Sequence, residues 1–181
     1  MVLEQIAIID TAIVFAVNSL RSPLMDLFFS AITWLGSIYF IFFLGLALLY
    51  KNKKAGANFL SGFLVNLAFI ILLKQIIFRP RPFEILPGII PLDNENSSSF
   101  PSGHAADAFF SATFLSKVYK KFSPVFYGAA VLVAFSRIYV GVHYPTDVLF
   151  GAIEGFIFAR VWMKNFDVEK VFRKLFSPKG R

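Results

Sequence analysis

Residues 55–78 read AGANFLSGFLVNLAFIILLKQIIF, and this apolar run sets the class of the protein. A helix needs about 20 residues to cross the hydrocarbon core of a bilayer, so the segment is long enough to span a membrane. The whole chain has the same character, because 57% of its 181 residues are hydrophobic and its mean hydropathy is +0.67. We therefore predict an all-helical (all-α) integral membrane protein with a single domain over residues 1–181.

Further apolar segments lie on both sides of this run, at residues 24–50, 102–118, 122–140 and 145–163. The first of them is long for one span, so we expect it to tilt or to kink near Gly36 and Ser37. Residues 3–20 are also apolar but include Glu4 and Asp10, which favours a helix lying in the membrane interface over a sixth span. The chain is thus predicted to form a polytopic bundle of five to six transmembrane helices.

The distribution of lysine and arginine predicts the orientation of this bundle. Thirteen of the eighteen basic residues lie at three places that five spans bring to one membrane face: Lys51, Lys53 and Lys54; Lys117, Lys120 and Lys121; and Arg160, Lys164, Lys170, Arg173, Lys174, Lys179 and Arg181. Because basic residues prefer the cytoplasmic side, we assign this face to the cytoplasm, with residues 165–181 as a basic cytoplasmic tail. The N-terminal segment and the loop at 79–101 then lie on the outer face.

Composition also excludes several classes of protein. The net charge is +7, but the basic residues bracket the apolar segments instead of forming one stripe, so no nucleic-acid partner is expected. The chain has no cysteine, which excludes disulfides and cysteine metal sites. Its N-terminus lacks the basic region and small-residue cleavage site of a removable signal peptide. No obligate protein partner is inferred.

Five basic residues fall on the outer face, which the charge rule disfavours: Arg21, Lys74, Arg79, Arg81 and Arg137. Most of them belong to three polar motifs, KQIIFRPRP at 74–82, PSGH at 101–104 and SRIYVGVHYPTD at 136–147. Each motif lies at the end of a predicted span, and the predicted topology brings all three to the same face. Both histidines of the chain are in these motifs.

The motifs have the residue types of a phosphate pocket. Lys74, Arg81 and Arg137 supply cationic donors, and the planar guanidinium group matches phosphate oxygens. PSGH opens a predicted helix, where free backbone N–H groups and the helix dipole favour an anion. Ser102 is placed to cap this helix or to donate to a ligand, and Gly103 lets a backbone approach closely.

His143 and Asp147 are four residues apart. They share a face if the last span is helical there, and they meet across the turn if Pro145 delays the helix. An aspartate bonded to one ring nitrogen fixes the tautomer and leaves the other nitrogen free to attack phosphorus. His104 is then available to protonate the leaving oxygen, while the cations stabilise charge on the transferring group. Two titrating histidines predict a bell-shaped dependence of activity on pH.

In order and spacing, these motifs resemble the type 2 phosphatidic acid phosphatase (PAP2) family, which shares its site with the vanadium haloperoxidases. The family pattern is Lys, six residues, Arg-Pro; then Pro-Ser-Gly-His; then Ser-Arg, five residues, His, three residues and Asp. The chain matches it at every position from Lys74 to Asp147. Arg79-Pro80 nearly repeats Arg81-Pro82, and only the spacing selects Arg81.

The resemblance implies a phosphatase that needs neither a metal nor a cofactor. In such an enzyme His143 would be the nucleophile that forms a phosphohistidine, Asp147 its orienting partner and His104 the general acid. The phosphate would be held by Lys74, Arg81, Ser102, Gly103 and Arg137.

Three ionisable residues lie outside the family pattern. Arg79 is a candidate for contact with the substrate headgroup, although a basic residue at a helix end often only reaches the interface. Asp107, three residues after His104, is a second candidate for contact with the substrate; otherwise it would tune the charge of Arg137 or Lys74, or would favour the start of its helix. Glu154 lies well inside the last span, far in depth from the motifs, and is expected to be structural.

The resemblance also implies a membrane lipid as substrate, reached at the outer, periplasmic face of a bacterial cytoplasmic (inner) membrane. Bacterial members act on undecaprenyl pyrophosphate, phosphatidylglycerophosphate or lipid A 1-phosphate. The short N-terminus and the loop at 83–100 leave little material for a headgroup domain, which favours undecaprenyl pyrophosphate or lipid A 1-phosphate. The alternatives are a phosphatidylglycerophosphate phosphatase, a lipid phosphotransferase with the same phosphohistidine, and a lipid-phosphate-binding protein without turnover. The apolar spans disfavour a haloperoxidase.

Overall fold

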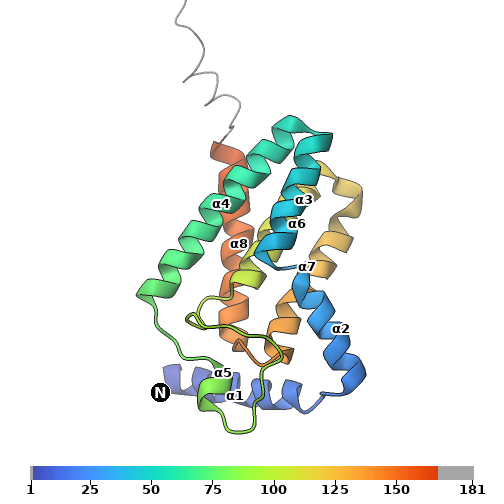
Figure 1. Ribbon diagram of the computed structural model, residues 1–181. Helices are drawn as coiled ribbons and strands as arrows, with labels where there is room; N and C mark the ends of the chain where they lie inside the picture. Colours follow the sequence, from blue (N-terminus) through green and yellow to red (C-terminus); the bar gives the residue numbers. More distant parts are fainter. Residues whose placement is uncertain (1, 167–181) are drawn as a thin grey trace, which may run out of the picture.

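The structure, a computed structural model of the chain, describes residues 2–166 (Figure 1). These residues form helices and no strand: α1 (Val2–Asn18), α2 (Pro23–Trp34), α3 (Ile38–Lys51), α4 (Lys53–Ile76), α5 (Pro82–Ile85), α6 (Gly103–Val118), the 3-10 helix η1 (Lys120–Phe122), α7 (Ser123–Tyr139) and α8 (Pro145–Asn165). The predicted all-helical architecture is confirmed for this part of the chain. The predicted basic tail lies almost entirely outside the described residues.

The central helix of the bundle is α6, which packs against α8, α7 and α4 (Figure 1). Ten of its sixteen residues are buried, and Ala105, Ala106 and Ala112 are among them. Small side chains let neighbouring helices approach closely, as is common inside membrane helix bundles. The PSGH motif ends in the first turn of this central helix.

Two glycines of α8 bring that helix against the start of α6. A Cβ atom on Gly151 would overlap the carbonyl oxygen of Ser102, and one on Gly155 would overlap that of Ala106. The backbone N–H of Ser102 donates to the carbonyl oxygen of Asp147 at 3.1 Å. The close packing therefore holds the first turn of α8 beside the first turn of α6.

Replacing Gly155 by alanine should destabilise the bundle, because the added methyl group forces α6 and α8 apart. Overpacking of this kind costs about 1–3 kcal/mol, so the midpoint of thermal unfolding in detergent should fall. Gly128→Ala is the matched control, since a Cβ at Gly128 meets no atom within 4 Å. Equal unfolding midpoints for the two variants would contradict this packing.

The long apolar run at 24–50 is broken between α2 and α3, so the predicted kink near Gly36 and Ser37 is confirmed. Ser37 is the N-cap of α3 and accepts a hydrogen bond from the backbone N–H of Phe40 at 3.2 Å. A Cβ on Gly36 would lie 2.5 Å from a methyl carbon of Val133 in α7. Glycine therefore lets the break pack directly against α7.

Length and apolar composition identify two candidate membrane spans among the described residues, α4 and the stretch Lys120–Tyr139 formed by η1 and α7. α1 and α2 together would be a third, with a bend of 120° between them, and α3 is a shorter apolar helix. α6 and α8 run along the same bundle (Figure 1), but α6 has only 16 residues, many of them small, and α8 carries four charged residues, Asp147, Glu154, Arg160 and Lys164. Their apolar signal is weaker because much of their surface contacts other helices, where small residues suit close packing.

α1 lies across one end of the bundle instead of along it (Figure 1). Its acidic residue Asp10 is buried, where it accepts hydrogen bonds from the backbone N–H of Thr146 at 3.0 Å and from Arg79 at 2.7 Å. Apolar side chains such as Ile8 and Ile9 are exposed. This orientation and exposure suit the interfacial alternative for the N-terminal helix, which we retain as a prediction.

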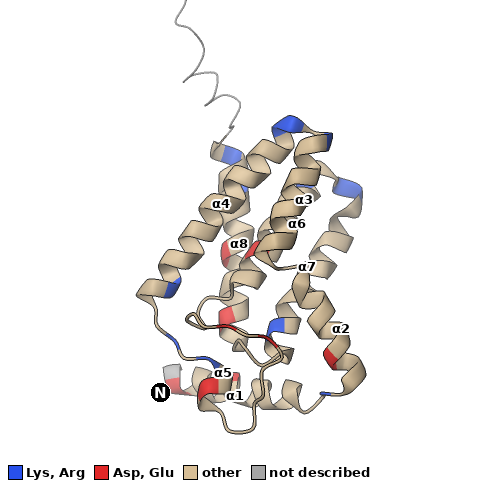
Figure 2. Ribbon diagram, in the orientation of Figure 1, with Lys and Arg blue, Asp and Glu red and all other residues tan. Residues whose placement is uncertain are grey.

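Most of the basic segments lie at the other end of the bundle (Figure 2). They are found where α3 meets α4, at η1 and near the C-terminal end of α8. The loop between α4 and α6, with the short helix α5, lies at the end near α1 (Figure 1). The three polar motifs thus gather away from the main basic groups, as the predicted topology requires.

Candidate active site

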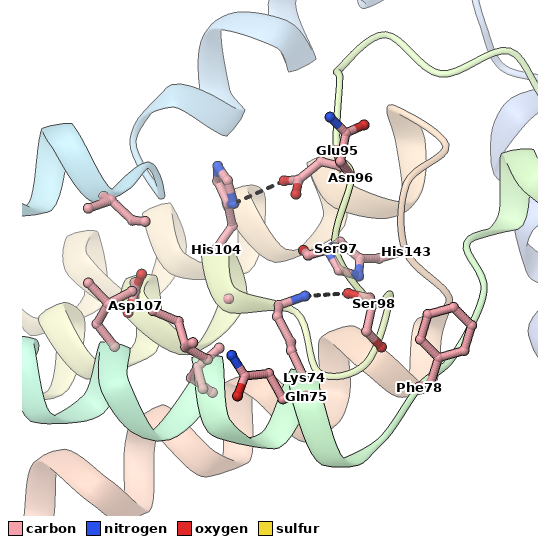
Figure 3. A pocket seen from close by; sticks show the side chains of 15 residues that line it. Lys74, Gln75, Phe78, Glu95, Asn96, Ser97, Ser98, His104, Asp107 and His143 are labelled. Carbon is pink, nitrogen blue, oxygen red and sulfur yellow. Dashed lines mark hydrogen bonds and ion pairs between the residues drawn. The ribbon is translucent and has the colours of Figure 1, made fainter.

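The three polar motifs border one cavity at the end of the bundle near α1. Lys74 lies in the last turn of α4, His104 in the first turn of α6, and His143 in the turn between α7 and α8. The cavity has a volume of about 480 Å³, and its polar end is lined by Lys74, Glu95, Ser97, Ser98, His104 and His143 (Figure 3). Its apolar wall comes from Ile38, Leu67, Ile70 and Ile71.

His143 is almost fully buried, and its two ring nitrogens have different surroundings. Nε2 lies 3.4 Å from Nη1 of Arg81. Because a guanidinium group only donates, Nε2 is the acceptor in this contact, and the proton of the neutral ring is on Nδ1. The lone pair that a nucleophile needs is therefore on the side of the ring that faces Arg81.

Nδ1 of His143 lies 3.6 Å from Oδ2 of Asp147, which is longer than a hydrogen bond. It has no hydrogen-bond partner in the described part of the chain, and catalytic contacts of this kind often shorten only when substrate binds. Pro145 is the first residue of α8, so His143 precedes the helix and Asp147 lies in its first turn. The structure thus has the second of the two predicted geometries, in which the side chains meet across the turn.

Burial lowers the pKa of His143 to about 3, although the Asp147 carboxylate acts in the opposite direction. A group with a lowered pKa stays unprotonated as the pH falls, so the ring should remain neutral down to about pH 4.5, where an ordinary histidine is mostly charged. NMR of ¹⁵N-labelled imidazole in the detergent-solubilised protein measures this directly. A midpoint of protonation near about 6.5 for His143 would contradict the expectation. The acid limb of the predicted bell-shaped pH profile should accordingly not arise from this residue.

Asp147 is held by three hydrogen-bond donors other than the His143 ring. Its carboxylate accepts hydrogen bonds from Ser99 Oγ, from the backbone N–H of Tyr144 at 2.9 Å and from Arg79. Arg79 also pairs with Asp10 at 2.7 Å, and its guanidinium carbon lies 4.0 Å from the centre of the Tyr144 ring. Arg79 is thus engaged with α1 and α8 and positions Asp147, while its direct contact with substrate stays a prediction.

Arg81 and Arg137 are fully buried and share one acceptor. The carboxylate of Glu95 accepts a hydrogen bond from Arg81 at 3.0 Å through one oxygen and from Arg137 at 2.7 Å through the other. Arg137 also donates to Asp93 at 2.8 Å and to the hydroxyl of Thr33. The structure therefore brings the two motif arginines together, with a carboxylate between them.

His104 lies beside the same carboxylate, with Nδ1 3.9 Å from an oxygen of Glu95 (Figure 3). Ser102 is the N-cap of α6 and accepts a hydrogen bond from a backbone N–H of the first turn at 3.4 Å. Of the two roles predicted for Ser102, the structure therefore has the helix cap. Gly103 lines the cavity, and a Cβ there would meet only Ile70, at 3.6 Å. The space over Gly103 is thus open to a ligand.

Lys74 and Asp107 also border the cavity. Lys74 donates to the carbonyl oxygen of Ser98 (Figure 3). Asp107 is buried and accepts a hydrogen bond from Asn66 at 3.1 Å, and within the described residues it forms no ion pair with Lys74. The contact with Asn66 ties Asp107 to α4, which is a structural link between two helices.

Glu154 lies in α8 and does not line the cavity. Both of its carboxylate oxygens are buried without a hydrogen-bond partner in the described part of the chain.

Sequence reasoning missed three acidic residues of the site. Asp10 had a signal, because an acid in an apolar helix is costly to bury without a partner. Asp93 and Glu95 lie in the polar loop before PSGH, where the local pattern does not separate them from the neighbouring asparagines. Together with His104 they place possible metal ligands within 4.8 Å of one another. The same carboxylates already pair with buried arginines, whose charge repels a cation, so we derive no metal site from them.

Comparisons with known proteins agree with this arrangement. The sequence profile of the PAP2 superfamily matches residues 54–170, which include all three motifs. Phosphatidylglycerophosphatase B of Bacillus subtilis is 35% identical over 181 aligned residues, which cover 91% of this chain and 85% of that protein. Lipid A 4'-phosphatase of Porphyromonas gingivalis is 29% identical over 173 residues, which cover 86% of this chain and 72% of that protein.

The fold is likewise similar to a solved structure. The crystal structure of LpxE from Aquifex aeolicus superposes with a TM-score of 0.79 at 34% sequence identity. The superposition covers 84% of this chain and 93% of that one. With the family profile matched over more than half of its length and all three motifs in place, the chain belongs to the PAP2 superfamily.

Proposed function

We propose that this membrane lipid phosphatase removes the phosphate or pyrophosphate end of a lipid through a phosphohistidine on His143. The observation that carries the proposal is the shared cavity: His143, His104 and Lys74 line its polar end, and aliphatic side chains of α3 and α4 line its wall. A lipid headgroup with the start of a hydrocarbon chain has the same division into charged and apolar parts. Undecaprenyl pyrophosphate and lipid A 1-phosphate are the favoured substrates.

The contacts of the site support a two-step reaction. Lys74, Arg81 and Arg137 would bind the phosphate oxygens, and Nε2 of His143 would attack phosphorus. The bond between phosphorus and the bridging oxygen of the lipid breaks, and His104 gives its proton to that oxygen. Water then attacks the phosphohistidine, His104 takes a proton from the water, and inorganic phosphate leaves as the ring of His143 is restored.

The relatives support a lipid substrate, but they are named for different headgroups, so the identity of the headgroup has to be tested. One is named for phosphatidylglycerophosphate and another for the 4'-phosphate of lipid A. The first is similar over nine tenths of this chain, which makes phosphatidylglycerophosphate the second candidate.

The outer face of a bacterial cytoplasmic membrane is our proposed location for the site. The basic groups at the α3–α4 junction, at η1 and at the end of α8 lie at the far end of the bundle from the cavity (Figure 2). Because basic residues prefer the cytoplasmic side, the cavity would open to the periplasmic side.

The deciding experiment is release of inorganic phosphate by the detergent-purified protein in EDTA. The lipids offered are undecaprenyl pyrophosphate, lipid A, phosphatidylglycerophosphate and phosphatidic acid. Release from one of them establishes the activity and names the substrate. Binding of a lipid without release would favour the binding-protein alternative, and transfer of the phosphate to a second lipid would favour the phosphotransferase.

A further inference from the structure

Glu95 occupies the place where the proposed function requires a phosphate. Its two carboxylate oxygens accept from Arg81 and Arg137 at 3.0 Å and 2.7 Å, and one of them is 3.9 Å from Nδ1 of His104. A carboxylate held by two guanidinium groups has the planar oxygen pair that phosphate also presents. The charged groups that a phosphate would bind are therefore already bound to an anion of the protein itself.

This anion balances charge that would otherwise be buried. Neither arginine side chain is exposed to solvent, and an unpaired charge in such a position is costly. Glu95 and Asp93 supply two negative charges to these two positive ones, through contacts of 2.7–3.0 Å. A phosphate that enters the site has to replace the carboxylate of Glu95, because both need the same donors.

Among residues 2–166, backbone hydrogen bonds fix the segment that carries Glu95 only on either side of it. Backbone hydrogen bonds hold the loop at Leu92, which donates to Val140, and at Ser99, which donates to Arg79. Residues 93–96 between them have no backbone–backbone hydrogen bond in the described structure. The Glu95 side chain is 21% exposed, whereas the arginines are not exposed at all. Contacts of side chains are thus what hold this short segment over the arginines.

We infer that Glu95 is a resident competitor for the phosphate site, displaced when substrate binds and returning as inorganic phosphate leaves. The inference rests on the proposed function. A terminal phosphate carries up to two charges and three free oxygens, so with Lys74 as a further donor it can displace a single carboxylate. A tethered carboxylate is present at an effective concentration in the millimolar range, so it competes with the free product. Glu95 thereby weakens the binding of both substrate and product.

The test is the affinity for inorganic phosphate, measured by titration calorimetry on the detergent-solubilised full chain at about pH 8, where phosphate is a dianion. Glu95→Gln keeps the volume of the side chain and removes its charge, and its Kd for phosphate should fall about tenfold, equivalent to about 1.4 kcal/mol. Asp26→Asn is the matched control, since Asp26 pairs with Arg21 at 3.1 Å outside the cavity. Its Kd should equal that of the wild type.

The sign of the change separates competition from a structural role. If Glu95 only holds the arginines in place, Glu95→Gln binds phosphate more weakly, and that result overturns the inference, as does an unchanged Kd. Glu95→Ala repeats the measurement if Glu95→Gln has a lowered unfolding temperature. The calorimetry needs no turnover, so tighter phosphate binding in a protein that releases no phosphate from any lipid would overturn the proposed function alone. In an active protein, the KM and the inhibition constant for phosphate should fall together.

Discussion

Replacing His143 by alanine should lower the rate of phosphate release from the lipid substrate by at least about 10⁴-fold. The ring is buried, its Nε2 faces Arg81, and burial keeps its pKa at about 3, so it is ready to attack without losing a proton first. Without it no covalent intermediate can form, and water has no activated route to phosphorus. The intermediate is measured by mixing the protein with lipid that carries radioactive phosphate and quenching the reaction rapidly. Phosphate bound to histidine remains on the protein in alkali and is released in acid.

Gln75→Ala is the control for His143→Ala, because Gln75 borders the same cavity but is exposed and is not part of the proposed chemistry. Its rate should stay within about twofold of the wild type. His143→Ala should still bind inorganic phosphate, since Lys74, Arg81 and Arg137 are unchanged. Labelled phosphoprotein that persists in His143→Ala would assign the nucleophile to another residue.

Replacing Asp147 by asparagine should lower kcat by roughly 10⁴-fold, the loss seen when the orienting aspartate of a catalytic triad is replaced by asparagine. An asparagine amide can donate to Nδ1 of His143, which moves the ring proton to Nε2 and removes the lone pair that attacks phosphorus. Asp147 is fully buried, and among the described residues its side chain forms no hydrogen bond or ion pair with Lys74, Arg81 or Arg137, so affinity for inorganic phosphate should change little. Rate measurements at saturating lipid, together with phosphate calorimetry, separate these two effects.

Asp10→Asn is the matched control for Asp147→Asn. Asp10 also accepts from Arg79, at 2.7 Å, but no contact joins it to His143 among the described residues. It should therefore lose far less activity than Asp147→Asn. Equal losses would mean that Asp147 acts by placing Arg79, and would contradict its proposed role in orienting the histidine ring.

The helices and the composition of the site could be predicted from local patterns. Apolar runs of about 20 residues become helices in a membrane because each backbone polar group must be satisfied within its own segment. The kink at Gly36 and Ser37 could be predicted from length, because the run is too long for one straight span. Motif spacing separated Arg81 from Arg79, and the structure places the former with Arg137 and the latter on Asp147.

Contacts between distant segments could not be predicted in this way. Asp10 and Thr146 are 136 positions apart, and Glu95 and Arg137 are 42 apart. The buried face of a helix can be predicted from the sequence, because apolar residues recur in it every three to four positions. A loop has no such periodicity, so its sequence does not indicate which residues it will contact. The position of the Glu95 carboxylate between two arginines follows from the packing of α6 against α8 and α7, which brings the ends of the loop and the turn after α7 together. That packing depends on the whole folded chain, and so only the tertiary structure could reveal the acidic side of this site.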